Sequence, residues 1–298
     1  MEFTPRQVVD IECEIGENPL WHPDDRRLYW CDIPQGRIHW YDPATETDGV
    51  AHESDESIGG FTIQDDGTLL LFQEYGAIRR LDPVEGRIDT AVEPDPDRFQ
   101  VRFNDVIADP AGRVFAGAMH ALDDGIPGRL YRLDRDGTLE TVIDEAILPN
   151  GMGFSGDRSQ FYFTDSAMGD PDTTGKIYRY EYDERSGGLT DPEVFVDSAG
   201  TPGFPDGMTV DEEDHVWSAY CGGNRVDRYD PDGNRVSTVD FDPDKVLCVT
   251  FGGENYDDVY ASTACQESRD VEGDGAGSLF RFEPGIGGRP EFRSRIDV

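Results

Sequence analysis

Four polar side chains recur at one phase of an internal repeat in this chain of 298 residues. Carboxylate and amide oxygens are hard ligands, and converging carboxylates repel each other unless a cation lies between them or one stays protonated. A repeat that brings such positions onto one ring predicts a metal site on a rotational axis, and therefore a candidate hydrolase. The four residues are Glu17, Asn104, Asn150 and Asp206, each five residues before a turn position (His22, Asp109, Ser155 or Asp211).

The types of donor narrow the choice of metal. The four positions carry carboxylates and amides, with no histidine and no pair of thiolates. This set favours Ca²⁺, Mg²⁺ or Mn²⁺, and Zn²⁺ can also bind through carboxylates. Three or four protein ligands leave coordination positions for water and substrate, as a metal catalyst requires. We therefore expect one divalent metal ion as the cofactor.

The elements that must position these side chains repeat six times along the chain. Each repeat has a polar anchor, a short apolar strand, an Asp/Gly-rich turn, an aromatic strand, a second turn and a strand with Arg or His. The anchors recur every ~40–55 residues, the range for four-stranded propeller blades. The pattern predicts an all-β fold, a single six-bladed β-propeller domain over residues 1–298. Residues 6–9 are expected to complete the last blade, because an open ring would expose an unpaired strand edge.

The innermost strand of each blade lines the channel of a propeller, so residues at equal phase form a ring. Some ring residues also fit another interpretation: Asn150-Gly151 and Asp206-Gly207 are strong hairpin-turn signals. Asn104-Asp105 is compatible with an Asx-turn. The common phase of four oxygen donors favours the metal ring over these separate turns. The predicted ring positions are Glu17, Gly60, Asn104, Asn150, Asp206 and Cys248.

An arginine stands next to one of the ring positions. Arg102 lies two residues before Asn104, which places both side chains on one face of an extended strand. A guanidinium there can bind substrate hydroxyls or a carbonyl at the mouth of the channel. The alternative is an ion pair with one of the many carboxylates of the surface.

The charge balance excludes several classes of partner. The chain has 26 basic and 63 acidic residues, a net charge of −37, and only two lysines, Lys176 and Lys245. This composition suits a protein of a halophile, hydrated in concentrated salt. Without a basic footprint, neither nucleic acid nor a membrane surface is an expected partner. The first residues lack a basic segment followed by an apolar one, so we expect a cytoplasmic protein.

Other catalytic signatures do not occur in the sequence. There is no GxSxG elbow, no P-loop and no GxGxxG motif after a strand, and the five cysteines have no CxxC spacing. We expect the cysteines to be reduced and mostly buried thiols. Three Asp/Gly/Pro-rich loops interrupt the repeat and are interpreted either as a lid or rim or as solvated insertions. They span residues 120–128, 167–175 and 266–277.

Five separated motifs resemble one known family over nearly the whole chain. The opening Gly16-Glu17-Asn18-Pro19-Leu20-Trp21 with the later Leu28-Tyr29-Trp30-Cys31-Asp32-Ile33 is similar to the E-x-P-x-W…L-Y-W-x-D-I motif of the gluconolactonase, senescence marker protein (regucalcin) and luciferin-regenerating enzyme family. The other four motifs agree in order: Arg102-Phe103-Asn104-Asp105, Pro149-Asn150-Gly151, Pro205-Asp206-Gly207-Met208, and Cys248 through Ala264.

This resemblance implies a six-bladed propeller and a divalent-metal lactonase that acts mainly on sugar lactones. It implies metal ligands at Glu17, Asn150 and Asp206, substrate contacts at Arg102 and Asn104, and Asp206 as the general base. The sequence departs from the family motif at Val106, where the family usually continues with glycine. It departs again after Met119, where family members often place a substrate-binding glutamate.

The resulting hypothesis is the hydrolysis of an aldonolactone to its aldonic acid, with the metal polarising the lactone carbonyl. Xylono-, arabinono- and gluconolactone fit oxidative pentose or hexose breakdown, and the sugar lactone is the only partner that the sequence predicts. Two alternatives stay open. One is a promiscuous ester or phosphotriester hydrolase, and the other is a calcium-binding propeller that is not an enzyme.

Overall fold

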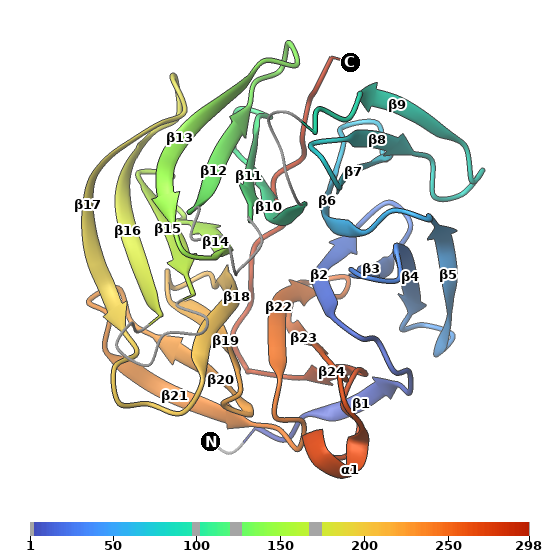
Figure 1. The fold of residues 1–298 in the computed structure, drawn as a ribbon. Helices are drawn as coiled ribbons and strands as arrows, with labels where there is room; N and C mark the ends of the chain where they lie inside the picture. Colours follow the sequence, from blue (N-terminus) through green and yellow to red (C-terminus); the bar gives the residue numbers. More distant parts are fainter. Residues whose placement is uncertain (1–2, 97–101, 120–126, 167–174, 298) are drawn as a thin grey trace.

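The computed structural model describes residues 3–96, 102–119, 127–166 and 175–297. Six four-stranded antiparallel sheets surround one central axis (Figure 1). The predicted six-bladed β-propeller is therefore confirmed. Four aromatic and β-branched strands per blade, separated by Asp/Gly-rich turns, account for almost all of the regular structure.

Each blade runs from an innermost strand at the axis to an outermost strand at the rim. Blade one contains β2 (Gly16–His22), β3 (Arg27–Asp32), β4 (Arg37–Asp42) and β5 (Thr47–Glu53), and blade two contains β6 (Ile58–Ile63), β7 (Leu69–Gln73), β8 (Ile78–Leu81) and β9 (Ile88–Val92). Blade three contains β10 (Phe103–Ala108), β11 (Val114–Ala118), β12 (Gly128–Leu133) and β13 (Leu139–Ala146), and blade four contains β14 (Pro149–Phe154), β15 (Gln160–Asp165), β16 (Lys176–Asp183) and β17 (Gly188–Asp197). Blade five contains β18 (Phe204–Val210), β19 (Val216–Cys221), β20 (Arg225–Tyr229) and β21 (Arg235–Asp240), and blade six contains β22 (Val246–Gly252), β23 (Asp258–Thr263), β24 (Leu279–Phe282) and β1 (Arg6–Val9).

The two ends of the chain meet in blade six. Strand β1 pairs antiparallel with β24, with Arg6 opposite Arg281. This pairing confirms the predicted closing strand and covers the edge that β24 would otherwise expose. The segment between β1 and β2 then carries the chain across the seam, from the last blade into the first (Figure 1).

Burial decreases from the axis to the rim of each blade. Every residue of β6 and β22 is buried, whereas β9 at the rim of blade two contains no buried residue. Aromatic side chains fill the space between blades: Phe72 packs edge-on against Phe103 at 5.3 Å between ring centroids. Burying one such ring stabilises the fold by roughly 1.5–3 kcal/mol, so the contacts between blades fix the positions of the innermost strands.

All six innermost strands contain a bulge where they reach the axis. In blade three, Phe103 pairs with Ala118 and Val106 with Ala116, so three steps of β10 face two steps of β11. One extra residue is likewise inserted in the other innermost strands, as three steps against two in β2, β14 and β18 and as two steps against one in β6 and β22. A bulge leaves one residue unpaired and re-aims its neighbours, and here it turns side chains toward the axis.

The segment after β24 crosses the axis, which the sequence did not predict. Residues 283–297 run over the face where the innermost strands end (Figure 1). Isolated bridges join Ser294 to Gln64 and Gly288 to Asp211. The segment covers this face, opposite to the face where the innermost strands begin. No helix among the described residues has the length and apolar character needed to cross a membrane.

Candidate metal centre

The structure brings the predicted ring residues together at the beginning of the innermost strands. Glu17 lies in β2, Asn104 in β10, Asn150 in β14 and Asp206 in β18, and all four side chains are at most 6% exposed. The turn interpretation of Asn150-Gly151 and Asp206-Gly207 is wrong, because both pairs lie inside strands. The pair Asn104-Asp105 likewise lies inside β10.

Glycine is required beside two of these positions because the strands approach each other closely at the axis. A Cβ atom on Gly151 would lie 2.4 Å from the carbonyl oxygen of Asp206. A Cβ atom on Gly207 would lie 2.3 Å from Sγ of Cys248. Real Cβ contacts do not occur at such distances. The two Asx-Gly pairs that mimic hairpin turns therefore reflect crowding at the axis.

A chain of hydrogen bonds orients the amide side chains. Arg102 Nη1 donates to Asn104 Oδ1 at 2.7 Å, and Asn104 Nδ2 donates to Asn150 Oδ1 and, at 2.9 Å, to the Pro149 carbonyl. Asn150 Nδ2 donates to Ser166 Oγ at 2.9 Å, and Ser166 Oγ donates to the Pro205 carbonyl at 2.5 Å. The bonds thus link Arg102, Asn104 and Asn150 to one another and anchor Asn150 through Ser166 to the neighbouring blade.

Three carboxyl groups converge beside this chain. Burial and the neighbouring carboxylates raise the pKa of Glu17 and of Asp206 well above the usual range. Burial raises the pKa of Asp105 to about 7, although the Arg102 guanidinium acts in the opposite direction. Burial in turn lowers the pKa of Arg102, while Glu17 and Asp105 favour its charged form. Without a further positive charge, burial and mutual repulsion favour the protonated forms of these carboxyl groups.

The residues fit a divalent cation by two observations. Ligand atoms of Glu17, Asp105 and Cys248 lie within 4.8 Å of one another, and Asp206 Oδ1 is buried without a hydrogen-bond partner among the described residues. Three ionised carboxylates and one guanidinium sum to −3 + 1 = −2, which one divalent cation neutralises. The donors favour a hard cation, because carboxylate and amide oxygens outnumber the single thiol of Cys248.

Two contributors to this centre were not predicted from the sequence. Asp105 was interpreted only as part of a turn, and strand alternation places it on the face opposite to Asn104. The bulge in β10 breaks that alternation and lets both side chains reach the axis. Ser166 follows β15 directly, and no motif marks it as the partner of Asn150. Cys248 was placed on the ring correctly but was not considered as a neighbour of the carboxylates.

Only one of the three interrupting loops is largely described. Residues 266–277 connect β23 to β24 and contain the short helix α1 (Arg269–Glu272). Glu272 is 4% exposed and forms an ion pair with Lys245, so this part of the loop packs against the blade, whereas residues 266–268, 270–271 and 274 are exposed. Residues 120–126 and 167–174 lie outside the described residues. Val106, the departure from the family motif, lines the cavity beneath the ring together with Met208 and Glu291.

The fold and the carboxylates at its axis define a class of propeller proteins with a single axial site. Residues 15–265 match the model of the SMP-30/Gluconolactonase/LRE-like region, and the chain belongs to that family. The family resemblance of the sequence motifs is thereby confirmed.

Individual relatives place the chain more closely within the family. It is 46% identical over 301 residues to Pentonolactonase XacC of Haloferax volcanii, with 99% of each chain covered. It is 31% identical to 6-deoxy-6-sulfogluconolactonase of Pseudomonas putida, covering 91% of this chain and 90% of that protein. Among solved structures, a calcium-binding protein, regucalcin, of Agrobacterium tumefaciens superposes with a TM-score of 0.88 at 25% identity, covering 99% of both chains.

Proposed function

We propose that the protein is a lactonase that hydrolyses aldonolactones to aldonic acids at the axial centre. The observation that carries this proposal is the buried group of Glu17, Asp105 and Asp206 beside the Arg102–Asn104 unit, in a chain 46% identical to a pentonolactonase. The same identity favours five-carbon lactones, such as xylono- and arabinonolactone, over gluconolactone. The acidic, lysine-poor composition supports a role in a salt-rich cytoplasm.

Glu17, Asn150 and Asp206 are the residues that we assign to the metal. Each comes from a different blade, so rigid packing between blades sets their mutual positions. A divalent cation held there supplies Lewis-acid polarisation of the lactone carbonyl. Asp105 adds negative charge next to Glu17 without a family role of its own. The carboxylate oxygens and the calcium-binding relative favour Ca²⁺ as the first metal to test.

Asp206 is the residue that we assign to proton transfer. Its Oδ1 atom has no hydrogen-bond partner among the described residues and is therefore available to a water molecule. In this scheme the carboxylate takes a proton from the water that attacks the carbonyl carbon, and a proton returns to the ring oxygen as its bond to that carbon breaks. The products are the carboxylic acid and the freed hydroxyl of the aldonic acid.

Arg102 and Asn104 are the residues that we assign to substrate orientation. The 2.7 Å hydrogen bond from Arg102 Nη1 fixes both groups relative to each other. A guanidinium has five N–H donors in a rigid fork, so Arg102 can bind substrate hydroxyls while it keeps this bond. Holding the lactone in one orientation lowers the entropic part of the activation barrier.

The experiment is a measurement of acid release from pentono- and hexonolactones in high salt. Metal-stripped protein receives Ca²⁺, Mg²⁺, Mn²⁺ or Zn²⁺, and each rate is compared with the spontaneous rate. We expect metal-dependent hydrolysis with a preference for pentonolactones. A matched panel of aryl esters and phosphotriesters tests the alternative hydrolase. Metal binding without turnover of any substrate would contradict the proposal and indicate a calcium-binding propeller.

A further inference from the structure

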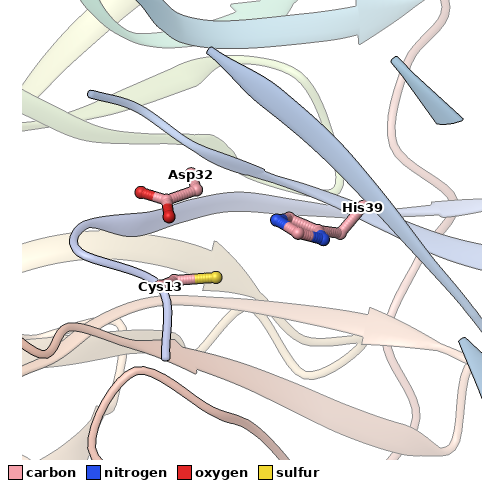
Figure 2. Close-up of side chains that lie close together, drawn as sticks. All are labelled: Cys13, Asp32 and His39. Carbon is pink, nitrogen blue, oxygen red and sulfur yellow. The ribbon is translucent and has the colours of Figure 1, made fainter. Parts of the chain in front are cut away.

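A second buried group of metal-ligating side chains lies in blade one, away from the axial centre. Cys13 precedes β2, Asp32 ends β3 and His39 lies in β4 (Figure 2). One ligand atom from each of these residues lies within 4.8 Å of the other two. Their exposed fractions are 1%, 3% and 4%. Cys13 and His39 lie outside the family motifs, whereas Asp32 is the aspartate of the opening L-Y-W-x-D-I motif.

Backbone contacts hold two of the ligands in place. Asp32 accepts hydrogen bonds from the backbone N–H groups of Glu14 at 3.1 Å and Ile15 at 3.2 Å. Both of its oxygens are engaged, and each retains a lone pair for a further partner. Cys13 is fixed through its own backbone, which donates to the Gly277 carbonyl at 3.0 Å and accepts from Cys265 N at 2.9 Å. The thiol is therefore held from the side of blade six.

The third residue, His39, has a buried ring nitrogen that no hydrogen bond satisfies among the described residues. His39 stacks on Trp30 with ring centroids 5.2 Å apart, which fixes the plane of the imidazole. Its Nε2 atom is buried and has no hydrogen-bond partner among the described residues. Figure 2 shows one ring nitrogen directed toward Asp32 and Cys13. A buried imidazole nitrogen normally has a partner, and a metal ion satisfies it as a hydrogen bond would.

We propose that Cys13, Asp32 and His39 form a zinc site. Thiolate, imidazole and carboxylate are the three ligand types of protein zinc, with zinc–ligand distances of about 2.0–2.3 Å. Tetrahedral geometry at these lengths separates the ligand atoms by roughly 3.5 Å, so the observed group closes by up to about 1.3 Å on binding. Water fills the fourth position. Calcium and magnesium prefer oxygen ligands and do not compete well here.

The location of the zinc site gives it a structural role. Cys13 belongs to the segment that crosses from the closing strand β1 to blade one, whereas Asp32 and His39 belong to the sheet of blade one. The backbone of Cys13 is also hydrogen-bonded to residues 265 and 277, at the two ends of the connection between β23 and β24 of blade six. An ion at this point therefore fastens the seam where the ring closes. Metal binding of this kind adds its binding free energy to the stability of the fold.

The experiment uses the full chain, stripped with a chelator and first saturated with Ca²⁺ to occupy the axial centre. Co²⁺ is then added as a spectroscopic probe, because cobalt–thiolate bonds absorb in the near ultraviolet. We expect about one Co²⁺ per chain with a thiolate band, displaced by one equivalent of Zn²⁺. X-ray absorption of the wild-type protein with one equivalent of zinc is expected to show one sulfur neighbour.

Matched variants assign the band to these residues. Cys13→Ser and His39→Gln are expected to lose the band and to weaken Co²⁺ binding at least tenfold. Cys265→Ser and His52→Gln make the same exchanges outside the group and are expected to retain both. Cys248→Ser tests the axial thiol and is also expected to retain the band. A band that persists in Cys13→Ser, or a wild-type zinc spectrum without sulfur, overturns the proposal. The wild-type measurement decides the matter even if a variant fails to fold.

Discussion

The axial centre and the blade-one group are equally buried, but they assemble their ligands in opposite ways. At the axis, Glu17, Asn150 and Asp206 come from three different blades and occupy the same place in each. In blade one, Cys13, Asp32 and His39 come from one sheet and the segment beside it. Asp32 has a counterpart in blade four, where Asp165 likewise accepts hydrogen bonds from the backbone N–H groups of two consecutive residues, Ile147 and Leu148. The repetition of the blades therefore assembles the axial centre, whereas the closure of the ring brings Cys13 next to Asp32 and His39.

The difference in donors separates the chemistry of the two sites. Carboxylate and amide oxygens suit a hard cation that must also receive water and substrate. A thiol, an imidazole and a carboxylate with almost no exposed surface suit an ion that stays bound and fastens the fold. One domain can therefore hold two divalent cations without exchange between the sites, because ligand softness selects each of them.

The largest expected effect is a loss of turnover without a loss of stability when Asp206 is replaced. Asp206→Asn keeps an oxygen ligand of the same size but removes the proton acceptor, so kcat for lactone hydrolysis should fall by roughly 10²–10⁴. Thermal stability and the cobalt–thiolate band of blade one should not change. Initial rates at saturating metal, with metal affinity measured in parallel, check this. Full turnover by a folded, metal-bound Asp206→Asn protein would exclude Asp206 as the base.

The pH dependence of stability should have opposite signs at the two sites in the metal-free protein. The pKa of Asp105 is raised to about 7 in the folded state, so the folded state binds more protons than the unfolded state between about pH 4 and pH 7. Its contribution to stability therefore falls as pH rises through this range. Burial lowers the pKa of His39 to about 4, so the unfolded state binds more protons between about pH 6.5 and pH 4, and stability falls as pH decreases.

Urea unfolding of the metal-free protein from pH 4 to pH 8 measures both effects. Each contribution is on the order of 3 kcal/mol over its range. Asp105→Asn should reduce the loss toward neutral pH, to which the raised pKa values of Glu17 and Asp206 also contribute, and His39→Gln should reduce the loss toward acid. Saturating Ca²⁺ should cancel the first effect and leave the second. If both variants shift the same limb of the curve, the two sites are not independent.

How far the sequence predicts each site depends on repetition. Six similar segments predicted the blades, the closing strand and the ring positions, because an error in one repeat is corrected by the other five. The outermost strands were not predicted: β9 and β21 are largely exposed and carry mixed polar residues without a clear alternation. The course of residues 283–297 was not predicted either, because this segment is not part of the sequence repeat. Its contacts are with turns of several blades that come together only when the ring is closed.

The two metal-ligating groups differ in the same way. Asp105 escaped prediction because a bulge reverses the face that strand alternation assigns to it. Cys13, Asp32 and His39 escaped because their spacing matches no metal motif and their meeting depends on the crossing at the seam. Sequence patterns report local periodicity, and neither a bulge nor a closure contact is periodic.

A smaller expected effect is an increase in Tm on zinc binding. It distinguishes a site at the seam between blades six and one from the axial centre. Zinc at 100 times its dissociation constant contributes about 2.7 kcal/mol of stability, which raises Tm by ~5 °C in a chain of this size. The increase should occur with calcium already bound and should vanish in Cys13→Ser but not in Cys265→Ser. Differential scanning calorimetry at fixed salt measures it. A zinc-dependent increase of equal size in Cys13→Ser would place the stabilising ion elsewhere.

The smallest expected effect tests how the axial amides are held. Ser166→Ala removes the acceptor of Asn150 Nδ2 at 2.9 Å and leaves the amide free to rotate away from the axis. A lost hydrogen bond of this kind costs about 0.5–1.5 kcal/mol, so metal affinity and kcat/KM should fall by roughly 2- to 13-fold. Thr164→Val is the matched control, because Thr164 Oγ1 lies two residues away in β15, buried and without a hydrogen-bond partner among the described residues. Its replacement should leave both quantities unchanged. If Ser166→Ala lowers stability as much as it lowers metal affinity, Ser166 supports the blade and not the ligand, and the axial amides are then held by packing.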